Sequence, residues 1–366
     1  MTYDPYKKYH LNKVINASGK MTILGVSKLS ESTKIAQQYG GSNFFEMDDL
    51  LVKTGNYIAD LLSCEDATIV SSASAGIALS VAGLIGKGSL YHLYHPYSNR
   101  ILKREIIIPK GHNVDYGTAV EVMIEQGGGT VVEAGYANMC TADHIISQVT
   151  DNTAAILYVK SHHTVQKSML SVEEAIAVAK KVNIPIIIDA AAESDIKKYA
   201  KMGSDLVIFS GAKAIEGPSS GLVFGNQKAI QWVRLQSKGI GRSMKIGKEN
   251  ILGFSQAVED YILNGSEDGE SMKMRLQPFL DKLNNIDGIV ASESQDPAGR
   301  EIYRAKVQPM KRKTASELVN QLTDGSPAIY TRNYLVNQGI IEFDIRAVNK
   351  EEMDCIVEKI TKIMNS

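Results

Sequence analysis

Short apolar runs rich in β-branched residues alternate with helix-like segments between about residues 65 and 225. Several of these runs are apolar at every position, as is typical of strands that helices cover on both faces. This alternation predicts an α/β fold with a mostly parallel sheet. The expected strands are Thr68–Ser71, Glu105–Ile108, Thr130–Glu133, Ala155–Lys160, Pro185–Asp189, Asp205–Ser210 and Gly221–Phe224.

The pattern changes after about residue 255, where helical segments lie beside strands that a turn at Asn337–Gly339 would join as a hairpin. This mixture predicts a smaller C-terminal α+β domain. We expect residues 21–260 to form the large domain, residues 261–366 the small one, and residues 1–20 to pack on the small domain. The expected elements of the small domain are helices Met272–Leu283, Thr314–Leu322 and Lys350–Met364 and strands Gly288–Ala291, Ile302–Val307, Ala328–Arg332 and Ile340–Ile345.

One segment, Ala67–Gly86, is long enough to span a membrane and carries no charged side chain. Its four serines and three glycines argue against insertion into a bilayer. We therefore predict a buried strand, a turn of small residues at Ser72–Gly76 and a buried helix at Ile77–Ile85.

The composition is that of a soluble globular protein: 44% of the 366 residues are hydrophobic, and 40 basic side chains nearly balance 41 acidic ones. The formal net charge of −1 provides no general attraction to nucleic acid or to an anionic membrane, so we expect neither as a partner. The three cysteines lie far apart without metal-ligand spacing, which predicts no metal site. Their odd number argues against a disulfide framework and fits a reducing, cytoplasmic location. Residues 1–13 lack the apolar core of a signal peptide.

A single lysine, Lys213, follows the strand Asp205–Ser210 in a turn of small residues that ends at Gly217. A lysine at the mouth of a parallel sheet loses hydration, which lowers its pKa and leaves a neutral amine for Schiff-base chemistry. Taken alone, the pattern also fits an ordinary surface lysine in a loop.

An acid, Asp189, ends the apolar strand 24 residues before Lys213. A carboxylate at the carboxyl end of a strand lies where α/β sheets bind ligands. In pyridoxal phosphate enzymes such an acid pairs with the pyridinium nitrogen and keeps it protonated. The alternative is that Asp189 caps the next helix, but an acid and a lysine on neighbouring strand ends are more specific together.

The turn Ser72–Gly76 opens a buried helix and could bind an anion. Free backbone N–H groups, hydroxyls and small side chains at a helix N-terminus favour negative charge and close approach. The same residues also serve as an ordinary helix cap. Together, the anion site, the acid and the lysine match the phosphate, ring nitrogen and aldehyde of pyridoxal 5'-phosphate.

The order of these residues resembles that of fold-type I pyridoxal phosphate enzymes, and the local motifs resemble the selenocysteine synthase-like family in particular. The resemblance extends over about residues 12–260. The motifs that carry it are Val14–Gly19, Gly40–Glu46, Asp189–Glu193, Phe209–Lys213, Gly217-Pro218 and Gly241–Asn250.

This resemblance implies a fold-type I, aminotransferase-like architecture, with a mostly parallel seven-stranded sheet in the large domain. It also implies pyridoxal 5'-phosphate as the cofactor and a homodimer or a higher homo-oligomer. Lys213 would carry the cofactor and Asp189 would hold its ring nitrogen. The other expected cofactor-binding residues are Ser74, Ala75, Gly76 and Ser210.

Within that family, the segment Ile108–Gly117 resembles the shorter D-glucosaminate-6-phosphate ammonia-lyases. Because the chain lacks the N-terminal extension that selenocysteine synthases use for tRNA, we expect a small-molecule substrate, a phosphorylated amino sugar acid. The implied reaction is α,β-elimination of the 3-hydroxyl with release of ammonia, which gives 2-keto-3-deoxygluconate 6-phosphate.

Histidines follow two of the expected strands. His112 lies just beyond Glu105–Ile108, where this fold class places an acid–base or ring-stacking residue. The alternative is a capping histidine. His162 and His163 follow Ala155–Lys160, and we expect one of the pair to contact the substrate.

Arg242, Lys245 and Lys248 recur at a spacing of three, which would place them on one helix face. A phosphorylated substrate needs guanidinium or ammonium groups, so Arg242 and Lys245 are candidate substrate-binding residues. A solvated helix face is the usual alternative for such a run.

Two other functions remain open, and a third is less compatible with the sequence. One is a different pyridoxal phosphate-dependent β-eliminating lyase or aldolase that acts on a smaller amino acid. Another is a non-catalytic sugar-phosphate-binding protein. A Rossmann-type oxidoreductase is disfavoured, because Gly-x-Gly-x-x-Gly is absent after the first predicted strand.

Overall fold

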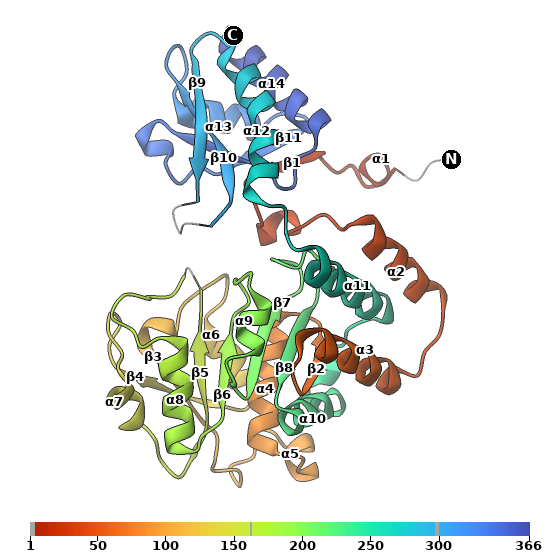
Figure 1. Ribbon diagram of the computed structural model, residues 1–366, viewed down its shortest axis with the longest axis vertical. Helices are drawn as coiled ribbons and strands as arrows, with labels where there is room; N and C mark the ends of the chain where they lie inside the picture. Colours follow the sequence, from red (N-terminus) through yellow and green to blue (C-terminus); the bar gives the residue numbers. More distant parts are fainter. Residues whose placement is uncertain (1–3, 162, 297–299) are drawn as a thin grey trace. The chain divides into compact units, whose positions relative to one another are not determined.

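The computed structural model describes residues 4–161, 163–296 and 300–366, so the candidate His162 lies outside the described residues. The chain divides into two compact units, each with its own core (Figure 1). The larger unit is Leu29–Gly265. The smaller unit combines Met1–Lys28 with Ser266–Ser366, so both ends of the chain contribute to it.

One sheet of seven strands forms the centre of the larger unit. The strands are β2 (Asp66–Val70), β3 (Glu105–Pro109), β4 (Thr130–Ala134), β5 (Thr153–Val159), β6 (Ile186–Asp189), β7 (Leu206–Ser210) and β8 (Gly221–Gly225). Their order is β2-β8-β7-β6-β5-β3-β4, and only β8 runs antiparallel to its neighbours. The predicted mostly parallel sheet and all seven predicted strands are therefore confirmed.

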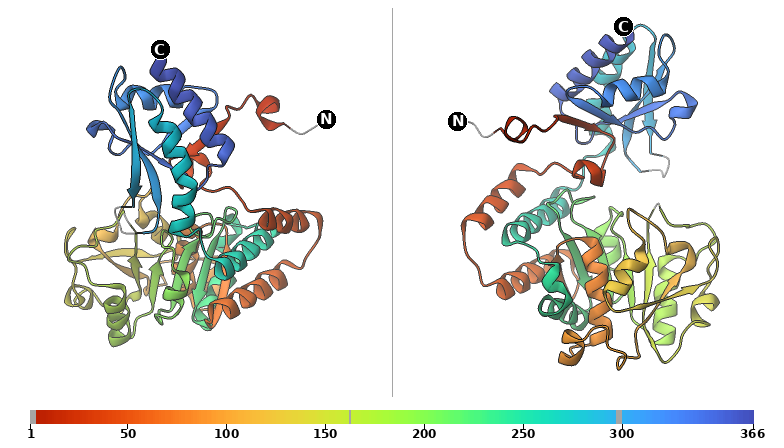
Figure 2. Two further views of the ribbon diagram at one scale, coloured as in Figure 1. Left: turned by 45° about the horizontal axis from the view of Figure 1, so that its top comes forward. Right: turned by 180° about the vertical axis from the view of Figure 1, so that it is seen from behind.

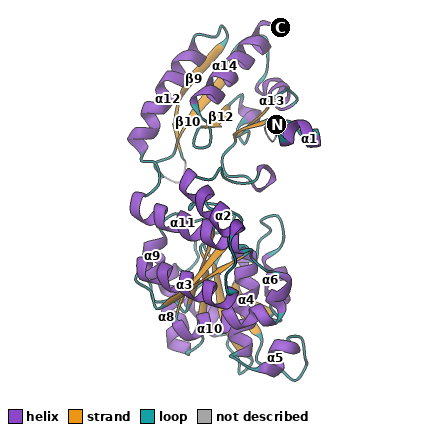
Figure 3. Cartoon of the chain, turned by 90° about the vertical axis from the view of Figure 1, so that its right-hand side faces the viewer, coloured by secondary structure: helices purple, strands orange, loops and turns teal. Residues whose placement is uncertain are grey.

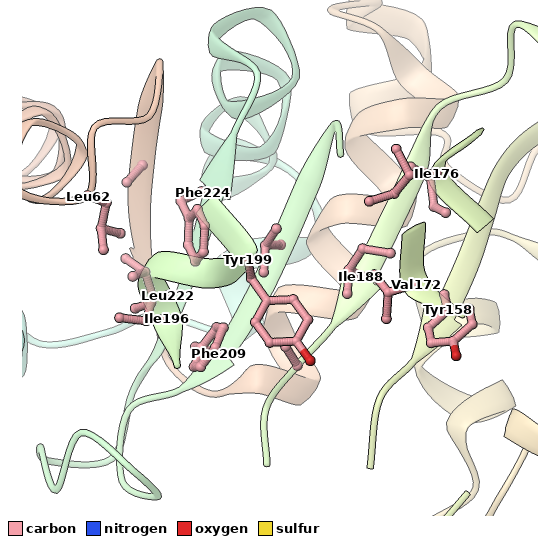
Figure 4. Packing of buried hydrophobic residues seen from close by; sticks show 14 of the residues in the cluster. Leu62, Tyr158, Val172, Ile176, Ile188, Ile196, Tyr199, Phe209, Leu222 and Phe224 are labelled. Carbon is pink, nitrogen blue, oxygen red and sulfur yellow. The ribbon is translucent and has the colours of Figure 1, made fainter. Parts of the chain in front are cut away.

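Helices cover both faces of this sheet, as Figures 2 and 3 show. Ile188 and Phe209 contribute to the core on one face, and Ile187 and Ile208 to the core on the other, because successive side chains of a strand point in opposite directions. Figure 4 shows Ile188 and Phe209 packed among residues from the covering helices. The helices of that face include α3 (Met47–Leu62), α8 (Val172–Val182), α9 (Ile196–Ala200) and α11 (Lys248–Asn264), and those of the opposite face include α4 (Ala73–Gly86), α6 (Val120–Gln126) and α10 (Gln227–Leu235).

Helix α4 begins four residues earlier than the sequence pattern suggested. Ser72 is its N-cap, and the Ser72 hydroxyl accepts a hydrogen bond from the Ala75 N–H at 3.0 Å. Ser74 and Gly76 therefore lie in the first helical turn and not in the preceding loop. No helix among the described residues is both long and apolar enough to cross a membrane.

The smaller unit contains two sheets. A parallel pair joins β1 (Val14–Ala17) to β11 (Ala328–Thr331), and three antiparallel strands follow the order β12-β10-β9. These three are β9 (Ile289–Gln295), β10 (Tyr303–Pro309) and β12 (Ile341–Asp344). Helices α12 (Gly269–Asn284), α13 (Ala315–Thr323) and α14 (Lys350–Asn365) supply much of the unit's core.

The expected hairpin between Ala328–Arg332 and Ile340–Ile345 forms only in part. Strand β11 pairs with β1 and β12 pairs with β10, and an isolated bridge between Arg332 and Glu342 connects the two segments. The partner of β11 comes from the N-terminal segment, more than 300 residues away in the sequence. Local turn signals cannot reveal such a distant partner.

The remaining helices are short or lie beside the main sheet. They are α1 (Pro5–Tyr9), α2 (Glu31–Ser42), α5 (Leu90–Tyr94) and α7 (Ala142–Ile146). Helix α2 lies alongside α11 in the larger unit, which Figure 2 shows from two sides.

Candidate active site

The carboxyl ends of the parallel strands meet at one edge of the large sheet. Asp189 ends β6 and is paired with Val159 of β5 and Ile208 of β7. Ser210 ends β7 and is paired with Gly221, and the same glycine is paired with Val70 at the end of β2. Asp189, Ser210 and the start of α4 therefore lie along the same edge.

The carboxylate of Asp189 is buried, with 7% of the residue exposed. Its Oδ1 accepts a hydrogen bond from the Ala191 N–H at 3.0 Å. Burial raises the pKa of Asp189 to about 6, although that hydrogen bond and the charge of Lys213 act in the opposite direction. A cation placed against this carboxylate would be stabilised, because it would compensate a costly buried charge.

Lys213 lies in the turn between β7 and β8. The turn is closed by hydrogen bonds from the Glu216 N–H to the Lys213 carbonyl at 3.2 Å and from the Gly217 N–H to the Gly211 carbonyl at 2.9 Å. Burial lowers the pKa of the Lys213 amine, while the charge of Asp189 raises it. The predicted acid and lysine therefore influence each other electrostatically in the folded chain, as adjacent strand ends require.

The start of α4 packs closely on the sheet. A Cβ atom added to Gly76 would lie 3.1 Å from Cγ2 of Ile208. The N–H groups of Ala75 and Gly76 are already used, because the hydroxyl and the carbonyl of Ser72 accept them. The donors that remain at this terminus are the N–H groups of Ala73 and Ser74, since the first N–H groups of a helix have no intrahelical acceptor.

Tyr116 belongs to the same region, although its sequence context does not predict it. Its phenol oxygen is 3.1 Å from the hydroxyl of Ser74. Burial and the charge of Asp189 both raise the pKa of Tyr116. The residue lies inside the segment Ile108–Gly117, but a tyrosine beside a loop glycine has no specific chemical pattern that would identify it.

His112 is completely buried in the short 3-10 turn Lys110–His112. Its Nε2 is 3.2 Å from the carbonyl oxygen of Val165, and its ring contacts Tyr158 edge-to-face with a centroid distance of 4.5 Å. Burial lowers the pKa of His112 to about 4, so the imidazole is neutral at neutral pH. These contacts favour a structural role, and the predicted catalytic role stays a prediction.

The candidate substrate-binding residues lie in loops. His163 is exposed in the loop after β5, where its N–H donates to the Ser161 hydroxyl at 3.2 Å. Arg242 lies in a 3-10 turn, Ile240–Ser243, and both Arg242 and Lys245 are exposed.

The expectation that Arg242, Lys245 and Lys248 share a helix face is wrong. Helix α11 begins only at Lys248, after its N-cap Gly247. Lys248 has a structural contact: its Nζ donates to the carbonyl oxygens of Gly40 and Gly41 near the end of α2. No cluster of three potential metal ligands was found in the part of the chain that the structure describes.

Comparison with known proteins shows the family. The family model for L-seryl-tRNA selenium transferase, SelA, matches residues 50–282, which is well over half of the chain. The chain belongs to the SelA family.

Two relatives align with nearly the whole chain. D-glucosaminate-6-phosphate ammonia lyase of Salmonella typhimurium is 40% identical over 368 residues, which cover 99% of this chain and 98% of the relative. A 5'-C-glycyluridine monooxygenase-decarboxylase of a Streptomyces species is 32% identical over 98% of this chain and 92% of the relative. Their different names show that family membership alone does not specify the reaction.

Solved structures confirm the fold. A structure of D-glucosaminate-6-phosphate ammonia-lyase superposes with a TM-score of 0.94 and 40% identity, covering 100% of this chain and 99% of the other. A serine palmitoyltransferase from Sphingomonas wittichii superposes with a TM-score of 0.54 at 11% identity, covering 95% of this chain and 86% of the other. The fold is that of fold-type I pyridoxal phosphate enzymes, and family and fold together indicate pyridoxal 5'-phosphate as the cofactor.

Proposed function

We propose that this chain is a pyridoxal phosphate-dependent ammonia-lyase that converts D-glucosaminate 6-phosphate to 2-keto-3-deoxygluconate 6-phosphate and ammonia. The observation that carries the proposal is the 40% identity to the ammonia lyase of that name, which extends over 99% of the chain. The site at the sheet edge supports it, because a buried acid and a desolvated lysine suit this cofactor chemistry.

The residues at this edge fit pyridoxal phosphate. The Lys213 amine would bind the aldehyde carbon, and the Asp189 carboxylate would hold the ring nitrogen in its protonated form. The start of α4, with Ser74, would hold the phosphate, since helix N-termini favour anions. Ser210 lies one strand away from Asp189 and completes the predicted set.

The bound cofactor supplies an electron sink for a carbanion at the substrate Cα. Lys213 Nζ is the proposed base that removes the Cα proton, and burial favours this role by lowering its pKa. The same Nζ can return the proton to the departing 3-hydroxyl, which leaves as water. His112 is a poorer proton donor, because its pKa of about 4 leaves it neutral. A second water releases ammonia, so the overall reaction forms the keto acid without a redox step.

The substrate is tested by measuring ammonia and keto acid from D-glucosaminate 6-phosphate, from its unphosphorylated form and from a panel of smaller 2-amino-3-hydroxy acids. We expect the highest kcat/KM with the phosphorylated sugar acid. Faster turnover of a smaller amino acid would instead support the alternative lyase or aldolase.

The cofactor is tested by the absorption spectrum of the purified protein. We expect a band near about 420 nm that disappears on treatment with borohydride, with the reduced cofactor attached to Lys213. A colourless protein that does not respond to added pyridoxal phosphate would support a non-catalytic sugar-phosphate-binding protein.

The exposed cations Arg242 and Lys245 remain predicted contacts for the substrate phosphate, and His163 a predicted substrate contact. If Arg242 binds that phosphate, Arg242→Ala should raise KM for the phosphorylated substrate about tenfold or more, because a charge-assisted contact is lost. KM for an unphosphorylated substrate should change little. Equal increases for both substrates would contradict the assignment.

The proposal includes a homo-oligomer in the cytoplasm. Ile35, Tyr39 and Phe44 are 59%, 61% and 98% exposed on α2 and just after it, and large exposed apolar side chains in one region are typical of protein interfaces. The cytoplasmic location is proposed from the three cysteines, whose odd number argues against a disulfide framework. Light scattering of the purified protein would show whether it is a dimer or a larger assembly.

A further inference from the structure

The loop that carries Tyr116 is held in one conformation by its own hydrogen bonds. The Asp115 carboxylate accepts the Gly117 N–H at 2.7 Å, and the Thr118 carbonyl accepts the Tyr116 N–H at 3.2 Å. Gly117 has a φ of +113°, which other residues rarely adopt. These hydrogen bonds and the backbone conformation of Gly117 therefore position Tyr116.

The ring of Tyr116 packs beside the core on the α4 face of the sheet, and its hydroxyl extends to the first turn of α4. There it is 3.1 Å from the hydroxyl of Ser74. Each of these hydroxyls has one proton and two lone pairs, and either can be the donor in their contact. Where Ser74 donates to Tyr116, the phenol proton stays available to a third group.

Two backbone donors lie at the same point. The N–H groups of Ala73 and Ser74 precede the first groups that α4 satisfies internally, and the structure gives them no acceptor among the described residues. Together with the one hydroxyl proton that this contact leaves available, they make three donors at the positive end of a helix of 14 residues. This number of donors suits an anion with several oxygens, such as a phosphate group.

The phenol is also suited electrostatically to this place. Burial raises the pKa of Tyr116. The hydrogen bond with Ser74 acts in the opposite direction and the charge of Asp189 in the same direction, and with the pKa raised the hydroxyl keeps its proton at neutral pH. The hydroxyl is therefore a proton donor beside Ser74, at the end of the proposed site where α4 begins.

We propose that the Tyr116 hydroxyl is a phosphate-binding group of the cofactor site, which acts with Ser74 and makes the site selective for pyridoxal 5'-phosphate over pyridoxal. This inference rests on the proposed cofactor site. It adds a ligand for the phosphate that the sequence did not reveal.

The test compares Tyr116→Phe with the wild-type full-length chain, each stripped of cofactor with hydroxylamine and titrated with pyridoxal phosphate or pyridoxal. The substitution removes one hydrogen bond to a charged group and keeps the ring. We expect the Kd for pyridoxal phosphate to rise about tenfold or more. The Kd for pyridoxal, which has no phosphate, should change less than about twofold. Tyr94→Phe is the matched control, because Tyr94 is 68% exposed on α5, and it should change neither Kd.

A second variant separates the role of the hydroxyl from a general effect on folding. Ser74→Ala should also weaken pyridoxal phosphate selectively. In the double variant the two losses should not be additive, because the hydroxyls contact each other. Thermal unfolding of each cofactor-free variant, followed by circular dichroism, should match the wild type within a few degrees.

The possible results distinguish this inference from the proposed function. An unchanged Kd for pyridoxal phosphate in Tyr116→Phe, or equal increases for both ligands, would overturn the role of Tyr116 and leave the cofactor site standing. If the wild-type chain binds neither ligand, both proposals fail. If it binds pyridoxal phosphate selectively through Tyr116 but releases no ammonia from D-glucosaminate 6-phosphate, only the proposed substrate fails.

Discussion

Among the buried carboxylates, Asp344 in the smaller unit and Asp189 in the larger unit have opposite electrostatic environments. Asp344 in the smaller unit is fully buried and accepts hydrogen bonds from Arg304 at 3.1 Å and from Arg346 at 2.8 and 2.9 Å. Burial alone would raise the pKa of Asp344, but Arg346 and Arg304 lower it to about 2. Asp189 in the larger unit accepts a backbone N–H, and its pKa is raised to about 6.

This difference separates a structural charge from one prepared for a ligand. Two guanidinium groups of the same chain compensate Asp344, so it has little need of an external partner. Asp189 has a single backbone donor and a lysine whose own pKa is lowered, so a cationic ring nitrogen would complete its environment. Unusual pKa values in opposite directions therefore indicate different roles for two buried acids.

The strongest test of the difference removes the lysine beside Asp189. Lys213→Ala should lower the rate of ammonia release by about a thousandfold or more, because the proposed base and the attachment point of the cofactor are lost together. Lys201→Ala is the control, since Lys201 is exposed and should retain normal turnover. Near-normal activity in Lys213→Ala would remove Asp189 and Lys213 from the catalytic role proposed here.

In the smaller unit the expected effect is on folding. Asp344→Asn should reduce the free energy of unfolding by about 3–5 kcal/mol, because the buried Arg304 then keeps only Asp296 as a counter-charge and the hydrogen bonds from Arg346 lose their charged acceptor. Urea unfolding would measure this loss. Asp287→Asn, at an exposed ion pair with Lys311, should cost less than about 1 kcal/mol. If the two substitutions reduced the free energy of unfolding equally, the network around Asp344 would stabilise the fold no more than an exposed ion pair does.

The corresponding substitution, Asp189→Asn, should change the free energy of unfolding in the opposite direction. A folded-state pKa of about 6, above the ordinary value of 3.8, means that stability falls as the pH rises between about 4 and 6, since the unfolded chain ionises first. Asp189→Asn removes this cost and should stabilise the cofactor-free protein by about 1–3 kcal/mol at pH 7. Urea unfolding at pH 4 and pH 7 would show whether the gain appears only at the higher pH.

The same variant should bind pyridoxal phosphate with a ring nitrogen that is less often protonated, and its turnover should fall. A less stable cofactor-free Asp189→Asn at pH 7 would contradict the contrast between the two acids.

The smallest effect on stability is expected at Asp296, because this carboxylate pairs with two arginines. Asp296 accepts from the half-exposed Arg300 at 2.8 Å and from the buried Arg304 at 3.1 Å. Arg300→Ala should reduce the free energy of unfolding by less than about 1 kcal/mol, because the buried partner remains and the lost contact is screened by solvent. A loss comparable to that of Asp344→Asn would show that the exposed arginine is essential to the network.

Much of the larger unit could be predicted from local sequence patterns. The seven strands were recognisable because each is a short apolar run, and Asp189 and Lys213 were recognisable because each follows such a run. The start of α4 was misplaced because serine and glycine suit both turns and first helical turns. Tyr116 was missed because its value depends on a 3.1 Å contact with a residue 42 positions earlier.

The order of residues along the chain was enough to specify an α/β sheet and to bring an acid and a lysine to one edge of it, because hydrophobic periodicity and strand ends are local properties. Folding in three dimensions settled what depends on distant partners. It paired β11 with β1, used Lys248 to bind carbonyls at the end of α2, and buried His112. It also surrounded Asp344 with arginines and left Asp189 without them, since a side chain's charge environment is set by neighbours that are remote in the sequence.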